Sequence, residues 1–109
     1  MRTFEVRDKA HKSGGEYVLG VEDTATHACY MIYGTLAPGE EGRLIKPGHG
    51  HEEIIIAVRG DIEVTGAHSG VLREGTAFHI AGDAECYLRN LTSADAVYIA
   101  AGGHTGHDH

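Results

Sequence analysis

Residues 46–60 read KPGHGHEEIIIAVRG. The apolar run at 54–58, in which four of the five residues are β-branched, is typical of a buried strand, and Gly60 predicts a turn at its end. The rest of the chain repeats this alternation of short apolar runs with turn residues. The runs cover residues 16–22, 27–36, 42–46, 53–58, 61–66, 70–72, 76–80, 86–90 and 96–101. Many short strands at regular spacing indicate an all-β sandwich or barrel, and no stretch shows sustained helical periodicity.

The metal-capable side chains of this stretch stand at the mouth of the predicted strand. Side chains alternate along a strand, so His49, His51 and Glu53 are predicted to share one face, with Glu52 directed away. Two imidazoles and one carboxylate resemble the ligand sets of non-haem iron, manganese, nickel and zinc sites. The alternative is a solvated, charge-rich turn before a strand.

The size of the chain suits one domain. Its 109 residues allow a single hydrophobic core, and 16 glycines with two prolines suit an all-β fold with many tight turns. We expect an N-terminal arm at 1–15, a β-barrel domain at 16–102 and a His-rich C-terminal tail at 103–109. The tail carries His104, His107, Asp108 and His109, and we interpret it as a segment that binds metal adventitiously.

Charge and hydropathy exclude several partners. A net charge of -7 argues against nucleic acid, whose binders carry basic patches. No apolar run approaches the roughly 20 residues that span a bilayer, so no membrane partner is expected. The first 15 residues lack the apolar core of a signal peptide, which predicts a cytoplasmic protein with Cys29 and Cys86 as reduced thiols.

The stretch around Glu53 resembles the first motif of the cupin family: Gly, five residues, His-x-His, three or four residues, Glu, six residues, Gly. Six residues separate Glu53 from Gly60, and His49 takes the second histidine position. The first histidine position is Pro47, which cannot bind a metal. The turn LAPGEEG at 36–42 is similar to the segment that leads into this motif.

The segment GTAFHIAGDAECYLRN at 75–90 resembles the second cupin motif: Gly, five residues, Pro-x-Gly, two residues, His, three residues, Asn. Gly75 and Asn90 fit the motif. Ala81 takes the proline position, Asp83 the glycine position and Cys86 the histidine position. The two resemblances imply an all-β, antiparallel cupin-type jelly-roll barrel in a single domain.

The resemblance also implies a remodelled metal site. His51 is placed to replace the missing imidazole, and Cys86 to offer a thiolate from across the barrel. The predicted ligands are His49, His51, Glu53 and Cys86, around a divalent transition ion that is zinc, iron, manganese or nickel. The alternative for Cys86 is packing in the barrel as a small hydrophobe.

Two classes of function follow from the resemblance. The first is a binding or sensing module that holds a small molecule and a metal without catalysis, which the missing ligands favour. The alternative is a metal-dependent enzyme, dioxygenase- or isomerase-like, acting on a small organic acid, thiol or sugar, with His79 and Tyr87 orienting the substrate. Exposed edge strands predict a homodimer, in which the YVLGV segment at 17–21 adds to a partner's sheet.

Overall fold

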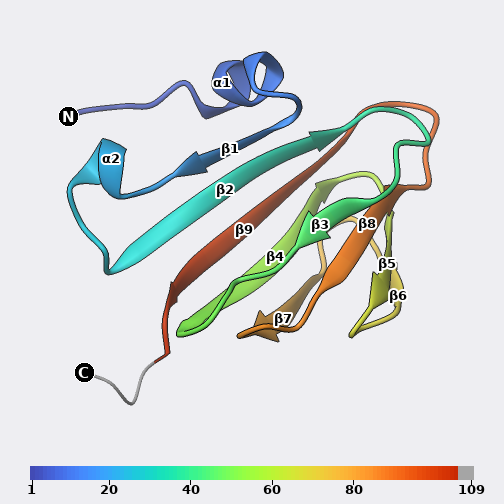
Figure 1. The fold of residues 1–109 in the computed structure, drawn as a ribbon. Coiled ribbons are helices and arrows are strands. Elements are labelled where there is room, and N and C mark those ends of the chain that lie inside the picture. The colour runs from blue at the N-terminus through green and yellow to red at the C-terminus, as the bar shows by residue number, and fades with distance from the viewer. Residues whose placement is uncertain (106–109) are drawn as a thin grey trace.

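The computed structural model describes residues 1–105, and each of the nine predicted apolar runs forms a strand there (Figure 1). The strands are β1 (Glu16–Leu19), β2 (Cys29–Leu36), β3 (Arg43–Ile45), β4 (His51–Arg59), β5 (Ile62–Gly66), β6 (Gly70–Leu72), β7 (Ala77–Ala81), β8 (Cys86–Asn90) and β9 (Ala96–His104). β9 therefore continues through His104, two residues past the barrel boundary predicted at residue 102.

All strand pairs are antiparallel, and the strands of residues 1–105 form two sheets. One has the order β1-β2-β9-β4-β7 and the other the order β3-β8-β5-β6. The predicted all-β, antiparallel jelly-roll fold is confirmed. We call this two-sheet body the barrel. No helix within the described part of the chain is long and apolar enough to cross a membrane.

Two short helices were not predicted: α1 (Val6–Lys12) and α2 (Val21–Thr24). In α1, Lys12 Nζ lies 3.1 Å from Asp8 Oδ2 one turn earlier, and Ala10 is fully buried. A helix is predicted from apolar residues that recur at helical spacing, and a single apolar contact does not create such a pattern in the sequence. The predicted N-terminal arm thus contains a helix that lies outside β1 in Figure 1.

The core follows the two-residue alternation of the strands. In β4, the side chains of Ile55 and Ala57 are buried, whereas those of Ile54 and Val58 are exposed. The inward side chains of both sheets meet in one apolar cluster. It includes Leu36, Ile45, Ile62, Ile80, Cys86, Leu88 and Tyr98.

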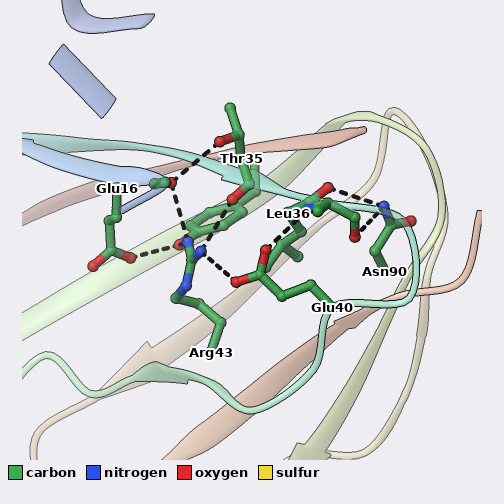
Figure 2. Close-up of polar contacts among 9 residues, drawn as sticks. Glu16, Thr35, Leu36, Glu40, Arg43 and Asn90 are labelled. Atoms are coloured by element: carbon green, nitrogen blue, oxygen red, sulfur yellow. Dashed lines mark hydrogen bonds and ion pairs between the residues drawn. The ribbon is translucent and has the colours of Figure 1, made fainter. Parts of the chain in front are cut away.

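Of the segment predicted to add to a partner's sheet, residues 17–19 lie in edge strand β1 and pair with β2 of the same chain, whereas Val21 begins α2. Arg43 helps to hold β1 there (Figure 2). Its Nη1 donates to the Tyr98 hydroxyl at 2.9 Å and to the Gly15 carbonyl at 3.2 Å. Its Nη2 donates to the Thr35 carbonyl at 3.1 Å and to Glu40 Oε2 at 3.0 Å. One guanidinium thus joins the start of β1 to β2 and β9.

Candidate functional site

An open pocket of about 370 Å³ lies where β4 begins and β9 ends. We call it the mouth pocket. Its lining combines apolar side chains, among them Val18, Val21 and Ile32, with polar ones. The complete lining is Val18, Gly20, Val21, Thr26, His27, Cys29, Tyr30, Ile32, Lys46, Pro47, His51, Glu53 and His104.

Glu53 is the buried acid of this pocket. Its side chain projects inward from β4 with the residue only 4 % exposed. The Tyr30 hydroxyl donates to its Oε2 at 2.5 Å from β2, across the intervening strand β9. Gly102 of β9 is paired with both residues. A Cβ at position 102 would lie 2.2 Å from Tyr30 Cζ, so only glycine lets the ring cross β9 at this height.

The environment of Glu53 pulls its pKa in two directions. Burial raises the pKa of the carboxyl above 4.5, while the hydrogen bond from Tyr30 and the nearby His51 oppose that rise. Burial and the same hydrogen bond raise the pKa of Tyr30, so Tyr30 stays protonated and acts as the donor. Oε1 takes part in none of the hydrogen bonds among residues 1–105. Every fully buried side-chain oxygen in this part of the chain has a hydrogen-bond partner. Because Oε1 has none, it is not fully buried and is open to the pocket.

Two histidines lie above this pair at the rim. His51 is directly opposite His104 in the pairing of β4 with β9, and their ring centroids are 4.9 Å apart. His51 Nδ1 lies 3.1 Å from the carbonyl oxygen of His49. A carbonyl only accepts, so this contact requires a proton on Nδ1 and leaves the lone pair of the neutral ring on Nε2.

His49 does not share the inward face with His51 and Glu53. β4 begins at His51, so His49 lies in the preceding turn, where its side chain is exposed and does not line the mouth pocket. Gly48 and Gly50 have φ angles of 94° and 80°, which bend the chain away from a strand. The predicted outward direction of Glu52 is observed, since its Oε1 lies 2.8 Å from His79 Nε2 on the outer surface.

Cys86 is fully buried within the apolar core and is not part of the mouth pocket. Its Sγ lies 3.9 Å from the His68 carbonyl oxygen, a weak contact of a packed thiol. Within residues 1–105, no three His, Cys, Asp or Glu side chains gather in an arrangement that would hold a metal ion. The predicted set of four ligands is therefore not assembled: the structure keeps His51 and Glu53 together and separates His49 and Cys86 from them.

Of the pocket residues, Tyr30 was not predicted from the sequence, and His104 was assigned to the C-terminal tail and not to a pocket. No motif or spacing marks Tyr30. The sequence does contain one indication for His104, because this residue continues the two-residue spacing of Tyr98 and Gly102, whose positions in β9 face inward. His79 and Tyr87, which the resemblance suggested for orienting a substrate, do not line the mouth pocket.

Comparison with solved structures gives the fold. Oxalate oxidase in complex with the substrate analogue glycolate superposes with a TM-score of 0.68 at 24 % identity, over 83 % of this chain and 51 % of that one. An RmlC-like cupin from Shewanella frigidimarina has a TM-score of 0.59 at 18 % identity, over 76 % of this chain and 72 % of that one. The protein has the cupin fold.

Among full-length matches, the cupin barrel described here is similar to the TT1209 protein from Thermus thermophilus. The TM-score is 0.69 at 17 % identity, over 95 % of this chain and 98 % of that one. This cupin chain spans about half the length of the oxalate oxidase chain. No protein-family model matches the sequence, and no curated protein does.

Proposed function

We propose that this cupin domain binds a small molecule in the mouth pocket, with Glu53 as its polar anchor. One observation carries the proposal: a nearly buried carboxylate has one oxygen fixed by Tyr30 and the other open to the pocket. A carboxylate taken out of water is costly unless its oxygens find donors. A ligand that brings an N–H, an O–H or a cationic group to Oε1 supplies the missing donor.

The rest of the pocket suits a molecule with an apolar body. Val18, Val21 and Ile32 are apolar residues of the lining, and contact with them would remove such a body from water. The pocket volume of about 370 Å³ falls within the roughly 300–1,000 Å³ typical of small-ligand sites. The ligand class that fits is therefore a small amine or hydroxyl compound with an aliphatic or aromatic portion.

The role proposed for Tyr30 and Glu53 is binding. Tyr30 holds its proton because burial raises its pKa further above neutrality, so it positions the carboxylate. The four residues predicted to hold a divalent transition ion do not fit one in this arrangement, and no step of the proposal runs through a metal.

The test uses a set of small amines and alcohols titrated into isotope-labelled protein and followed by NMR. We expect amide signals of residues 51–53 and 102–104 to shift with amine and hydroxyl compounds. Glu53→Gln should abolish binding of the amines, because the charge that attracts them is gone. Glu52→Gln is the matched control, since this neighbouring glutamate faces outward. Amine binding that survives Glu53→Gln, or that shifts only signals elsewhere, would overturn the proposal.

A further inference from the structure

We propose that two copies of this chain form a dimer through the outer side of the five-stranded sheet. We call the part of that side formed by β2, β9 and β4 the outer face. Its side chains point away from the core and from Glu53, so the inference does not rest on the proposed ligand binding. The sequence predicted a dimer through an edge strand, whereas this dimer forms through the face of the sheet.

The outer face is apolar. Ile54 and Val58 of β4 point away from the core and are 55 % and 46 % exposed. On β9, Ile99 and Ala101 alternate with buried residues and therefore point the same way. Met31 of β2 is paired with Ala101, which puts both side chains on one face. A sheet with one face in water normally alternates apolar and polar residues, and these strands do not.

The sequences of β4 and β9 are those of strands covered on both faces. Residues 54–58 read IIIAV and residues 96–101 read AVYIAA. Near-continuous apolar runs of this kind are typical of strands that are buried on both sides. The core of the barrel covers one side of these strands, whereas the exposure of Ile54 leaves the other side of β4 open within residues 1–105. A second copy supplies the missing cover.

The outer side of the four-stranded sheet has a different character. Arg89 Nε lies 2.9 Å from Glu63 Oε1 there, and Lys46 Nζ lies 3.3 Å from Glu85 Oε2. Charged side chains of this kind suit a face in water. The protein thus presents one charged sheet face and one apolar sheet face. Large apolar patches of this kind mark surfaces of interaction.

The size of the sheet suits a stable dimer. β2, β9 and β4 have eight or nine residues each and pair along almost their full length. At about 3.3 Å per residue and about 4.8 Å between strands, the five strands cover roughly 600 Å² in projection. Specific interfaces bury about 600–1,000 Å² on each partner. The available area therefore reaches the range that a stable dimer needs.

The position of β9 in the middle of the sheet suits a two-fold contact. A two-fold axis along β9 stacks β9 on its copy, and β2 on β4 of the other chain. It also places α1 of each copy, which stands at the β1 margin of the sheet, beside β7 of the other copy (Figure 1).

An axis across the strands is disfavoured by α1. Lys9 Nζ lies 5.2 Å from the centre of the Tyr17 ring, so the helix lies on the outer side of β1. An axis across the strands would bring the two α1 helices together at one margin. Each helix has three lysine or arginine residues and one acid, and their like charges would repel.

The register of the sheet gives the contacts that the axis along β9 predicts. Met31, Ala101 and Ile54 lie at one level across β2, β9 and β4. The axis keeps this level, so Met31 of one copy meets Ile54 of the other, and Ala101 meets its own copy. A shallow groove lined in part by Ile54, Ala101 and Gly103 provides room at this place. The flexible side chain of methionine is suited to filling such an irregular gap.

The first test is the mass of the protein in solution, measured by analytical ultracentrifugation over a dilution series. The unaltered chain should be a dimer at the higher concentrations. Ile54→Lys should raise the dissociation constant of the dimer about thirtyfold or more, the effect of losing a hot-spot residue. Leu44→Lys is the matched control and should leave the dimer intact, because Leu44 is 47 % exposed but lies on the other sheet. Ala101→Lys is a second variant in case circular dichroism shows that Ile54→Lys is unfolded.

The second test is NMR of a mixed dimer with one labelled and one unlabelled copy. We expect a nuclear Overhauser effect between the Met31 methyl group of one copy and the Ile54 side chain of the other. Contacts of β2 with β2 across the dimer would overturn the axis along β9.

Three results would overturn the dimer through the outer face. One is a monomer mass for the unaltered chain at every concentration. Another is a dimer that Ile54→Lys and Ala101→Lys leave unchanged, since that dimer would form through edge strand β1 or another surface. The third is an equal loss of the dimer in Leu44→Lys. Neither test measures ligand binding, so the proposed function stands or fails separately.

Discussion

The hydroxyl of Tyr30 lies 2.5 Å from Oε2 of Glu53 although β9 separates the strands that carry them. Gly102, on β9 between them, provides the gap through which the ring passes. The polar end of the pocket therefore depends on β2, β9 and β4, and on the absence of a side chain at Gly102 in the middle strand.

The same arrangement occurs a second time in this sheet. The hydroxyl of Tyr98 on β9 lies 2.5 Å from Oε2 of Glu16 on β1. The strand between them is β2, where Gly34 is paired with both residues. A Cβ at Gly34 would lie 2.0 Å from Tyr98 Cζ. A tyrosine ring thus lies over a glycine at two places in the five-stranded sheet. In one place it ties β1 to the barrel, and in the other it shapes the pocket.

Tyr30→Phe should destabilise the fold. The buried carboxylate of Glu53 loses its donor, and hydrogen bonds to charged groups contribute about 1.5–3 kcal/mol. The pKa of Glu53 should rise further, because the bond from Tyr30 opposes the effect of burial. Urea unfolding at neutral pH measures the change. Tyr33→Phe is the control, because its hydroxyl makes no hydrogen bond to residues 1–105. Equal stabilities of the two variants would contradict the assigned role of Tyr30.

Glu53→Gln should change how stability depends on pH. Burial raises the pKa of the folded carboxyl above 4.5, so this group favours the folded state most at low pH, and that contribution is lost as pH rises through the raised pKa. Glutamine carries no charge and accepts the same bond from Tyr30. The variant should therefore gain stability relative to the unaltered protein between about pH 4 and pH 7. Thermal melts at both pH values measure the difference, and a difference that does not grow with pH would argue against a raised pKa.

Gly34→Ala should destabilise more than Gly102→Ala. Both would place a Cβ within 2.2 Å of a tyrosine ring, but Tyr98 is fully buried and has nowhere to move, whereas Tyr30 is partly exposed at the pocket. Overpacking of a core typically lowers the free energy of unfolding by about 1–3 kcal/mol, and we expect the loss in Gly34→Ala to lie at the upper end of this range. Denaturant unfolding ranks the two variants. A larger loss in Gly102→Ala would contradict this account.

Arg43→Lys should loosen the N-terminal segment. The guanidinium donates hydrogen bonds to four acceptors. A lysine ammonium lacks the planar arrangement of N–H groups that makes this possible. We expect the free energy of unfolding to fall by about 2–3 kcal/mol, which is less than the roughly 3–5 kcal/mol lost when a buried ion pair is fully broken. Limited proteolysis should cut before residue 16 sooner than in the unaltered protein. The control is Arg89→Lys, whose exposed pair with Glu63 at 2.9 Å should contribute under about 1 kcal/mol. Similar losses in both variants would refute the anchoring role.

The expected homodimer remains a prediction. β1 and β7 are the edge strands of the five-stranded sheet, and an unpaired edge is a template for another chain. Pairing of β1 with β1 of a second copy would cover that edge while leaving the pairing of β1 with β2 intact. Light scattering at tens of micromolar should give twice the mass of one chain, and a monomer mass would contradict the expectation.

Much of the fold could be read from the sequence because its determinants are local. Nine apolar runs bounded by turn residues became nine strands, since alternation of side chains along a strand needs no knowledge of its neighbours. The same rule placed His51 and Glu53 on one face and Glu52 on the other. It failed for His49, because two glycines with positive φ end the extended backbone before that residue.

The composition of the site was decided by tertiary structure. Tyr30 reaches Glu53 only because β2 and β4 flank β9, and His104 meets His51 only because of the register between β4 and β9. Cys86 occupies a motif position that suggested a ligand, yet the packing of the two sheets encloses it in the core. Strand order and register depend on contacts between residues far apart in the chain. Local patterns thus determined the strands and their faces, and long-range pairing determined which side chains share the pocket.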